Sequence, residues 1–168
     1  NRPMGIGVQG LADTFVLCGL PFDDPRALAL STRISEHMYH AALDASCTLA
    51  ETLGTHESYE GSPISRGVLH FDHYDVQTEL DWEPLRERLR ENGVRHSVFI
   101  AYMPTASTSR IYGNNECFIP YTRLLYVRRT LMGEYVVCSK HFLRALHEEG
   151  LCTPEIADAL AKADGRAR

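Results

Sequence analysis

Residues 97–109 read Ser-Val-Phe-Ile-Ala-Tyr-Met-Pro-Thr-Ala-Ser-Thr-Ser, and this stretch decides the fold class. The short apolar run that ends at Ala101 predicts a buried strand over 94–101. A polar loop follows at once over 103–109, and we expect a short helix after it. A buried strand that runs directly into a polar loop and a helix is typical of an α/β protein.

The polar loop carries Thr105, Ser107 and Thr108 within four residues. Backbone N–H groups at the start of a helix carry partial positive charge, and hydroxyl groups add further donors. The loop therefore has the chemistry to hold a phosphate group without lysine or arginine. The same hydroxyls also suit a turn that caps its own helix. Taken alone, these residues leave both interpretations open.

A long helix is the clearest element before this stretch. Asp24 suits the N-cap position, and Pro25 suits the first helical position. Apolar residues then recur every three or four positions as far as Leu53, which predicts a single buried stripe. Gly54 is expected to end this helix.

Two shorter helices are predicted on either side of it. Apolar residues at helical spacing predict a buried helix over 6–20, with Gly19 as its stop. Asp81 is expected to cap a second helix that ends at 92–93. Its buried side is predicted to carry Trp82, Leu85 and Leu89.

The C-terminal part is predicted to contain two strands, 124–131 and 134–137, followed by helices over 139–149 and 154–164. The whole order of elements fits an α/β protein with parallel connections, but it holds too few strands for a closed barrel. The chain also starts at Asn1 rather than Met. We therefore expect a segment of a larger α/β unit.

Composition excludes several classes. Of the 168 residues, 44% are hydrophobic and 23% charged, which fits a globular chain rather than a disordered one. A net charge of −5 argues against a nucleic-acid binder, and no apolar run approaches the roughly 20 residues of a membrane helix. The five cysteines form no C-x-x-C pair, so we expect no zinc ribbon and no disulfide scaffold. A reducing compartment is expected, and Cys47 should pack as a small apolar residue.

Two other patterns are weaker. Gly5, Gly7 and Gly10 match the spacing of a dinucleotide-binding fingerprint, but no strand precedes them. We favour glycines that permit close helix packing. The paired histidines offer too few ligands for a metal site and are expected to be solvated or hydrogen-bonded. These pairs are His37 with His40 and His70 with His73.

Several blocks resemble the large subunit of class I ribonucleoside-diphosphate reductases. RPMGIGVQGLAD at 2–13 is similar to the family's R-P-I-G-I-G-V-Q-G-L-A-D, and YEGSPISRG at 59–67 to its Y-E-G-S-P-x-S-x-G. MPTAST at 103–108 and GNNE at 113–116 match family motifs directly. The blocks appear in family order and span nearly the whole chain.

The resemblance implies a fold and a site. The family's catalytic domain is a ten-stranded α/β barrel of two antiparallel halves, and residues 1–168 are expected to form a helix-rich, partial catalytic barrel domain from the second half. In the family, the P-T-A-S-T motif binds the diphosphate of the nucleotide substrate. The matching positions are Pro104, Thr105, Ala106, Ser107 and Thr108.

The resemblance also implies a reaction, in which a cysteine thiyl radical starts the replacement of a ribose 2′-hydroxyl by hydrogen. The radical cysteine lies upstream in the family and the redox cysteines lie elsewhere, so we expect no catalytic residue, metal or bound cofactor in this segment. The implied partners are a ribonucleoside diphosphate, a second large subunit, and a small subunit that bears a metal and a radical. Thioredoxin or glutaredoxin as reductant, ATP and dNTP effectors, and a cytoplasmic location are also implied. The five cysteines here are expected to be structural.

Two departures from the family pattern keep a second hypothesis open. Ile119 stands where the family usually has glutamate, and Tyr102 stands where it usually has proline or a small residue. Similar drift occurs in viral large subunits that have become protein-interaction scaffolds. The alternative is therefore a catalytically inactive homologue that binds other proteins.

Overall fold

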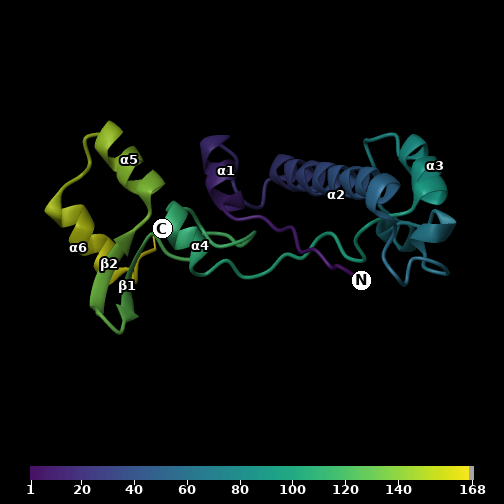
Figure 1. The fold of residues 1–168 in the computed structure, drawn as a ribbon. Coiled ribbons are helices and arrows are strands. Elements are labelled where there is room, and N and C mark those ends of the chain that lie inside the picture. Colours follow the sequence, from purple (N-terminus) through teal and green to yellow (C-terminus); the bar gives the residue numbers. More distant parts are fainter. Residues whose placement is uncertain (167–168) are drawn as a thin grey trace.

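The computed structural model describes residues 1–166, and Figure 1 shows that they form an elongated arrangement. No helix in this range is long and apolar enough to cross a membrane. The elements are α1 (Leu11–Leu17), α2 (Pro25–Leu53), the 3-10 turns η1 (Ile64–Arg66) and η2 (His70–His73), α3 (Glu83–Asn92), α4 (Thr108–Tyr112), β1 (Leu125–Thr130), β2 (Gly133–Cys138), α5 (Lys140–Glu148) and α6 (Pro154–Lys162).

The residues before α1 form an extended segment that lies beside residues 98–101. Ile6 and Ile100 make a parallel bridge, in which the Ile6 N–H donates to the Phe99 carbonyl at 2.9 Å. The predicted helix over 6–20 is therefore wrong in its first part. The predicted strand over 94–101 is reduced to this bridge and to the backbone hydrogen bonds beside it, such as that from the Met4 N–H to the Val98 carbonyl at 2.9 Å.

Glycines allow these two extended backbones to approach each other. A Cβ atom on Gly7 would lie 2.8 Å from the Ala101 carbonyl oxygen, closer than real Cβ atoms come. Gly10 has a φ of 76° at the N-cap of α1, a conformation that favours glycine. The interpretation of these glycines as helix-packing residues is wrong, although the close backbone approach behind it is correct.

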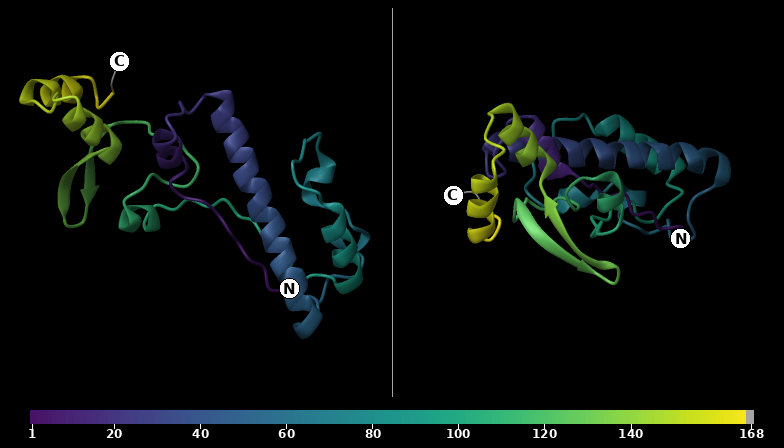
Figure 2. Two further views of the ribbon diagram at one scale, coloured as in Figure 1. Left: turned by 90° about the horizontal axis from the view of Figure 1, so that it is seen from above. Right: turned by 90° about the vertical axis from the view of Figure 1, so that its left-hand side faces the viewer.

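The long helix α2 forms as predicted. The Asp24 side chain accepts a 2.8 Å hydrogen bond from the Arg26 N–H, which satisfies one free donor of the first turn. Gly54 ends the helix with a φ of 74°. Both views in Figure 2 show α2 as a straight rod, and it packs against α3.

The main hydrophobic core lies between α2, α3 and the segments around them. Its buried members are Ala42, Leu43, Cys47, Tyr59, Leu69, Trp82, Leu85, Leu89, Val94 and Phe99. The predicted buried face of α3 is thus confirmed. A smaller core joins α1 to the start of α2 through Leu11, Phe15 and Ala27.

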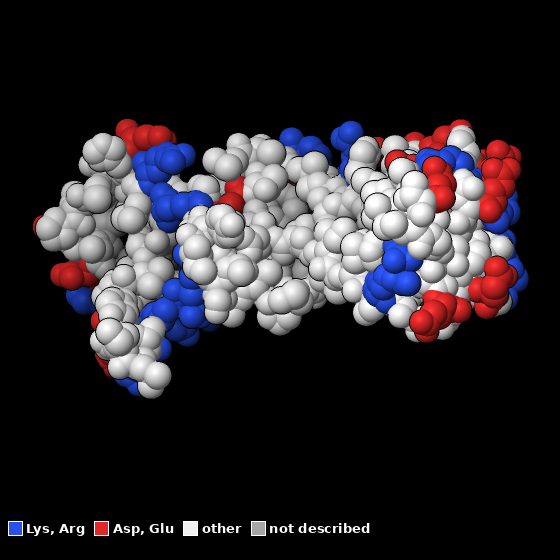
Figure 3. Space-filling view, viewed as in Figure 1, with Lys and Arg blue, Asp and Glu red and all other residues white. Residues whose placement is uncertain are grey.

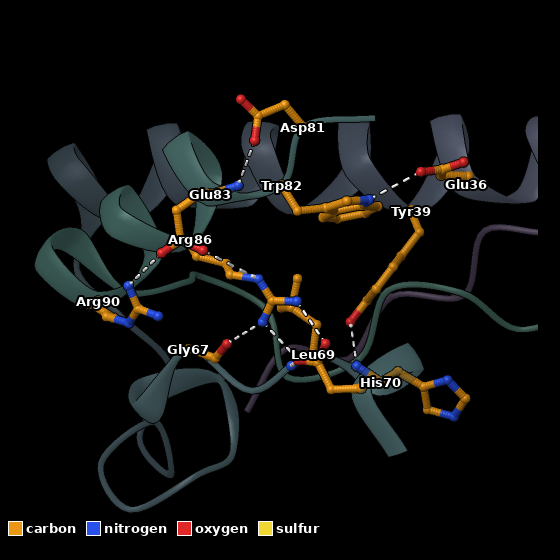
Figure 4. Close-up of polar contacts among 11 residues, drawn as sticks. Glu36, Tyr39, Gly67, Leu69, His70, Asp81, Trp82, Glu83, Arg86 and Arg90 are labelled. Atoms are coloured by element: carbon orange, nitrogen blue, oxygen red, sulfur yellow. Dashed lines mark hydrogen bonds and ion pairs between the residues drawn. The ribbon is translucent and has the colours of Figure 1, made fainter. Parts of the chain in front are cut away.

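A buried carboxylate fastens α2 to the loop before α3. Glu36 is only 9% exposed, and its carboxylate accepts hydrogen bonds from the backbone N–H groups of Glu79 and Leu80. It also accepts a hydrogen bond from Trp82 Nε1 (Figure 4). Burial raises the pKa of Glu36, but these donors outweigh it and hold the pKa below its ordinary value. These hydrogen bonds hold the loop before α3 against α2.

An ion pair holds the irregular segment 61–75 against α3. Arg86 Nη2 lies 2.6 Å from Asp72 Oδ1, and Arg86 Nη1 donates to the Gly67 carbonyl (Figure 4). The Arg86 guanidinium also lies 5.4 Å from the centre of the Phe71 ring. The hydrogen bonds from Arg86 lower the pKa of Asp72.

The C-terminal part forms a separate hairpin and two helices at one end of the molecule (Figures 1 and 2). β1 and β2 pair antiparallel from Leu125 opposite Cys138 to Thr130 opposite Gly133. Both strands and both helices agree with the prediction within a few residues. Thr153 caps α6 by accepting from the Ile156 N–H at 3.4 Å.

Candidate functional site

The polar loop connects the extended segment 98–101 to α4, near the middle of the molecule (Figure 1). The Thr105 carbonyl accepts hydrogen bonds from the Ser109 N–H at 2.9 Å and from Ser109 Oγ at 2.6 Å. Ser109 is fully buried, so these bonds fix the turn that opens α4. The short helix expected after the loop is confirmed.

The three hydroxyls of the loop are placed differently. Thr105 Oγ1 is half-buried and accepts from the Cys117 N–H at 2.8 Å, which leaves its own proton available to an acceptor. Ser107 is exposed at the N-cap of α4, and within the described chain its side chain makes no capping bond. Thr108 is also exposed, and its hydroxyl donates to Gln9 Oε1 at 3.0 Å. The loop hydroxyls are therefore not used up in capping their own helix.

The back of the loop is fixed by the turn over 113–117. The Cys117 N–H binds Thr105, as described, while the Asn115 carbonyl accepts from the Gly10 N–H at 3.0 Å. The Asn115 N–H in turn donates to Asp13 Oδ2 at 2.6 Å. This turn therefore links the polar loop to α1.

Asp13 is the centre of a buried polar cluster. Its side chain is 8% exposed, and Oδ1 accepts from Tyr121 Oη and from His141 Nε2, each at 2.7 Å. Lys140 Nζ lies 3.4 Å from the same oxygen. Burial raises the pKa of Asp13, but the hydrogen bonds from Asn115, Tyr121 and His141 outweigh it and hold the pKa below its ordinary value. Burial and the bond to Asp13 raise the pKa of Tyr121.

The loop itself, residues 103–109, carries no lysine, arginine, aspartate or glutamate. Figure 3 shows charged side chains at both ends of this face, a group of Lys and Arg side chains between the left end and the middle, and a middle that is mainly uncharged. Arg110, on α4, is paired with Glu116 at 3.7 Å. An anion at the loop would therefore be held chiefly by N–H and hydroxyl dipoles.

A largely apolar groove of about 790 Å³ lies between α2, the segment 62–82 and residues 97–102. Tyr102 stands at its edge, where Tyr102 Oη donates to Ser35 Oγ at 2.7 Å. The Tyr102 ring packs against Phe118 with centroids 5.7 Å apart. Tyr102 thus holds the chain against α2 directly before the polar loop.

The remaining predicted positions show no cluster suited to a metal ion within residues 1–166. His37 is hydrogen-bonded to the Arg33 carbonyl at 2.8 Å, and the His40 ring lies edge-on to Trp82, as expected of ordinary histidines. Cys47 is fully buried, which raises its pKa and confirms its packing role. Cys117 is buried and Cys138 half-buried, whereas Cys18 and Cys152 are exposed and contribute little to packing.

Comparison with known proteins decides the family. The family described as the ribonucleotide reductase barrel domain matches residues 1–167. The chain belongs to the ribonucleotide reductase barrel-domain family. It is 52% identical to the ribonucleoside-diphosphate reductase large subunit of Arabidopsis thaliana and 48% identical to the large chain of Schizosaccharomyces pombe, each over 98% of this chain.

A solved structure supports the barrel fold. The class Id ribonucleotide reductase alpha subunit of Actinobacillus ureae matches 99% of this chain and 25% of its own, with a TM-score of 0.70 and 21% identity. The chain spans about a fifth of the length of the reductase relatives it matches, 20% for the Arabidopsis protein and 21% for the yeast one. The expectation of a helix-rich segment of the α/β barrel is thus confirmed.

Sequence reasoning missed the residues that support the loop. Gln9 and Asp13 both lie within residues 6–20, which were predicted to form one buried helix. Each is hydrogen-bonded to a residue about a hundred positions away. One signal was available for Asp13, since a carboxylate among the apolar residues of a buried helix needs partners. Gln9 lies just before α1, and no residue pattern indicates its contact with Thr108.

Proposed function

We propose that residues 1–168 are a segment of the large subunit of a ribonucleoside-diphosphate reductase, forming part of its catalytic barrel domain. The proposed reaction converts ribonucleoside diphosphates to deoxyribonucleoside diphosphates for DNA synthesis. A thiyl radical outside this segment removes the 3′ hydrogen, the 2′-hydroxyl leaves as water, and a cysteine pair supplies the electrons. The support is the family match over nearly the whole chain.

Within that enzyme, the segment supplies the diphosphate-binding loop. The residues we assign to it are Pro104, Thr105, Ala106, Ser107 and Thr108. The observation that carries this assignment is the state of the hydroxyls: Ser107 and Thr108 are exposed, and the Thr105 proton is not used by its bond to Cys117. Thr105 and Ser107 can each donate a hydrogen bond to a phosphate oxygen, whereas the Thr108 hydroxyl donates to Gln9 Oε1 in this structure.

The rest of the site has a supporting role. Asp13 and the turn over 113–117 hold the back of the loop, because Asn115 is bonded to Asp13 and Cys117 to Thr105. Fixed donors lose little freedom when an anion binds. No catalytic residue or metal ligand is assigned to this segment.

The whole enzyme would act with partners that this segment does not itself reveal. We propose a large-subunit homodimer, a small subunit that bears a metal and a radical, and thioredoxin or glutaredoxin as reductant. ATP and dNTP effectors and a cytoplasmic location belong to the same proposal.

Reductase kinetics of the full-length protein test the loop assignment. Thr108→Val keeps the shape of the side chain but removes one hydrogen bond to a charged acceptor, so the KM for a ribonucleoside diphosphate should rise about tenfold or more. Thr52→Val is the matched control, because Thr52 bonds only to its own helix at the far end of α2. An unchanged KM in Thr108→Val would overturn the assignment.

A further inference from the structure

The Thr108 hydroxyl proton is directed to acceptors within the chain. Thr108 Oγ1 donates to Gln9 Oε1 at 3.0 Å and lies 3.3 Å from the Thr105 carbonyl oxygen, a second acceptor. A hydroxyl has one proton and two lone pairs. With its proton shared between these two acceptors, Thr108 offers only lone pairs to the surface, and lone pairs repel a phosphate oxygen.

Gln9 is fixed in a way that allows its side chain to turn without the backbone. The neighbouring Gly10 N–H donates to the Asn115 carbonyl at 3.0 Å, and Ile6 is bonded to the segment 98–101 on the other side. The half-buried Gln9 side chain carries an acceptor and a donor on one planar group. A half-turn of the amide exchanges Oε1 for Nε2 at the same place.

We propose that Gln9 is a positioning residue that sets the direction in which Thr108 donates. This inference rests on the proposed function of the loop. In this structure the Gln9 oxygen accepts the Thr108 proton. When a diphosphate binds, the amide turns, Nε2–H donates to Thr108 Oγ1, and the Thr108 proton goes to a phosphate oxygen. The hydrogen bond between Gln9 and Thr108 is kept in both states, with donor and acceptor exchanged.

The chemistry explains why glutamine suits this position. A glutamate would be an acceptor in both orientations, so it would keep the Thr108 proton and add a negative charge beside the anion. A leucine would fill a similar space but would neither accept from Thr108 nor donate to it. Comparing glutamine, glutamate and leucine at position 9 therefore distinguishes the effect of hydrogen-bond direction from the effect of packing.

The experiment measures the inhibition constant of inorganic pyrophosphate, with kcat and KM for a ribonucleoside diphosphate, in the full-length reductase. Thr108→Val should raise the inhibition constant of pyrophosphate about tenfold, as expected for the loss of one hydrogen bond to a charged acceptor. Gln9→Leu should raise this constant only about twofold to threefold, and Gln9→Glu about thirtyfold. The KM for the ribonucleoside diphosphate should rise in the same order as the inhibition constant, because both ligands use the same loop. Gln77→Glu, in the exposed loop before α3, is the matched control.

Double variants decide whether Gln9 acts through Thr108. In the Thr108→Val background, Gln9→Leu should have no further effect on the inhibition constant. Gln9→Glu should raise the constant only about threefold there, because only the repulsion between its charge and the anion remains. The inference is wrong, and the loop assignment stands, if Gln9→Leu raises the inhibition constant by the same factor in both backgrounds. It is also wrong if Gln9→Glu raises the constant no more than Gln9→Leu does. If Thr108→Val itself leaves pyrophosphate binding unchanged, the proposed function fails and the inference falls with it.

Discussion

Replacing Asp13 by asparagine tests how the loop is held in place. The side chain keeps its size, but the amide has one acceptor oxygen where the carboxylate has two. The Asn115 N–H donates a hydrogen bond to Oδ2 of Asp13, and Tyr121 Oη and His141 Nε2 are hydrogen-bonded to Oδ1. At least one of these donors must then face the new NH₂ group, and the remaining bonds lose their charge assistance.

The magnitude follows from the burial of the cluster. The side chains of Asp13 and His141 are 8% and 9% exposed, so solvent screens the interaction very little. A hydrogen bond to a charged group contributes about 1.5–3 kcal/mol, and an unsatisfied buried donor costs about 1–3 kcal/mol. Asp13→Asn should therefore lower the local stability of the turn over 113–117 by about 3 kcal/mol.

Hydrogen exchange of the full-length protein measures this loss. The Cys117 amide should exchange about 100-fold faster in Asp13→Asn, because its protection depends on opening of the turn. Asp24→Asn is the matched control, since asparagine caps a helix as well as aspartate does. Unchanged protection at Cys117 would show that Asp13 does not hold the loop.

The same cluster predicts a pH dependence. The pKa of Asp13 is held below its ordinary value in the folded protein. Its contribution to stability is thus complete above the unfolded-state pKa, near 4, and is lost as pH falls through the folded-state pKa. The difference in stability between the wild type and Asp13→Asn should accordingly narrow below about pH 4.

Three further changes test the fold. Gly7→Val should separate the segments around Ile6 and Ile100, since even a Cβ would contact the Ala101 carbonyl at 2.8 Å, and faster exchange of the Ala101 amide would report it. Glu36→Leu leaves the Trp82 Nε1 donor and two backbone N–H groups unsatisfied, so the free energy of unfolding should fall by about 3 kcal/mol or more, which urea denaturation would show as a lower midpoint. Thr153→Ala removes the cap of α6, and exchange of the Ile156 amide should become about fivefold faster for a loss of about 1 kcal/mol, whereas an unchanged rate would mean that the cap is not used.

Local signals in the sequence were enough for the elements that depend on short-range interactions. The N-cap at Asp24, the stop at Gly54 and the strand-turn-strand pattern around Met132 each act within a few residues, and each was predicted correctly. The error over 6–10 has a different cause. Those residues are extended because they pair with a segment more than 90 positions away, and the local spacing of apolar residues carries no information about that segment.

The candidate loop was found through its hydroxyls and through the family motif, but its supporting residues were not. Asp13 meets Asn115, Tyr121 and His141 only after the chain has folded. Gln9 reaches Thr108 for the same reason. Contacts of this range are set by the packing of whole elements, so no local pattern in one sequence predicts them.

The most direct test of the central claim compares a ribonucleoside diphosphate with the bare ribonucleoside. Equilibrium binding of both to the full-length protein isolates the part of the affinity that belongs to the diphosphate. Ser107→Ala with Thr108→Val removes two hydroxyl donors and should reduce the preference for the diphosphate at least about tenfold, with nucleoside affinity unchanged. A preference that survives intact in this double variant would contradict the assignment of the loop.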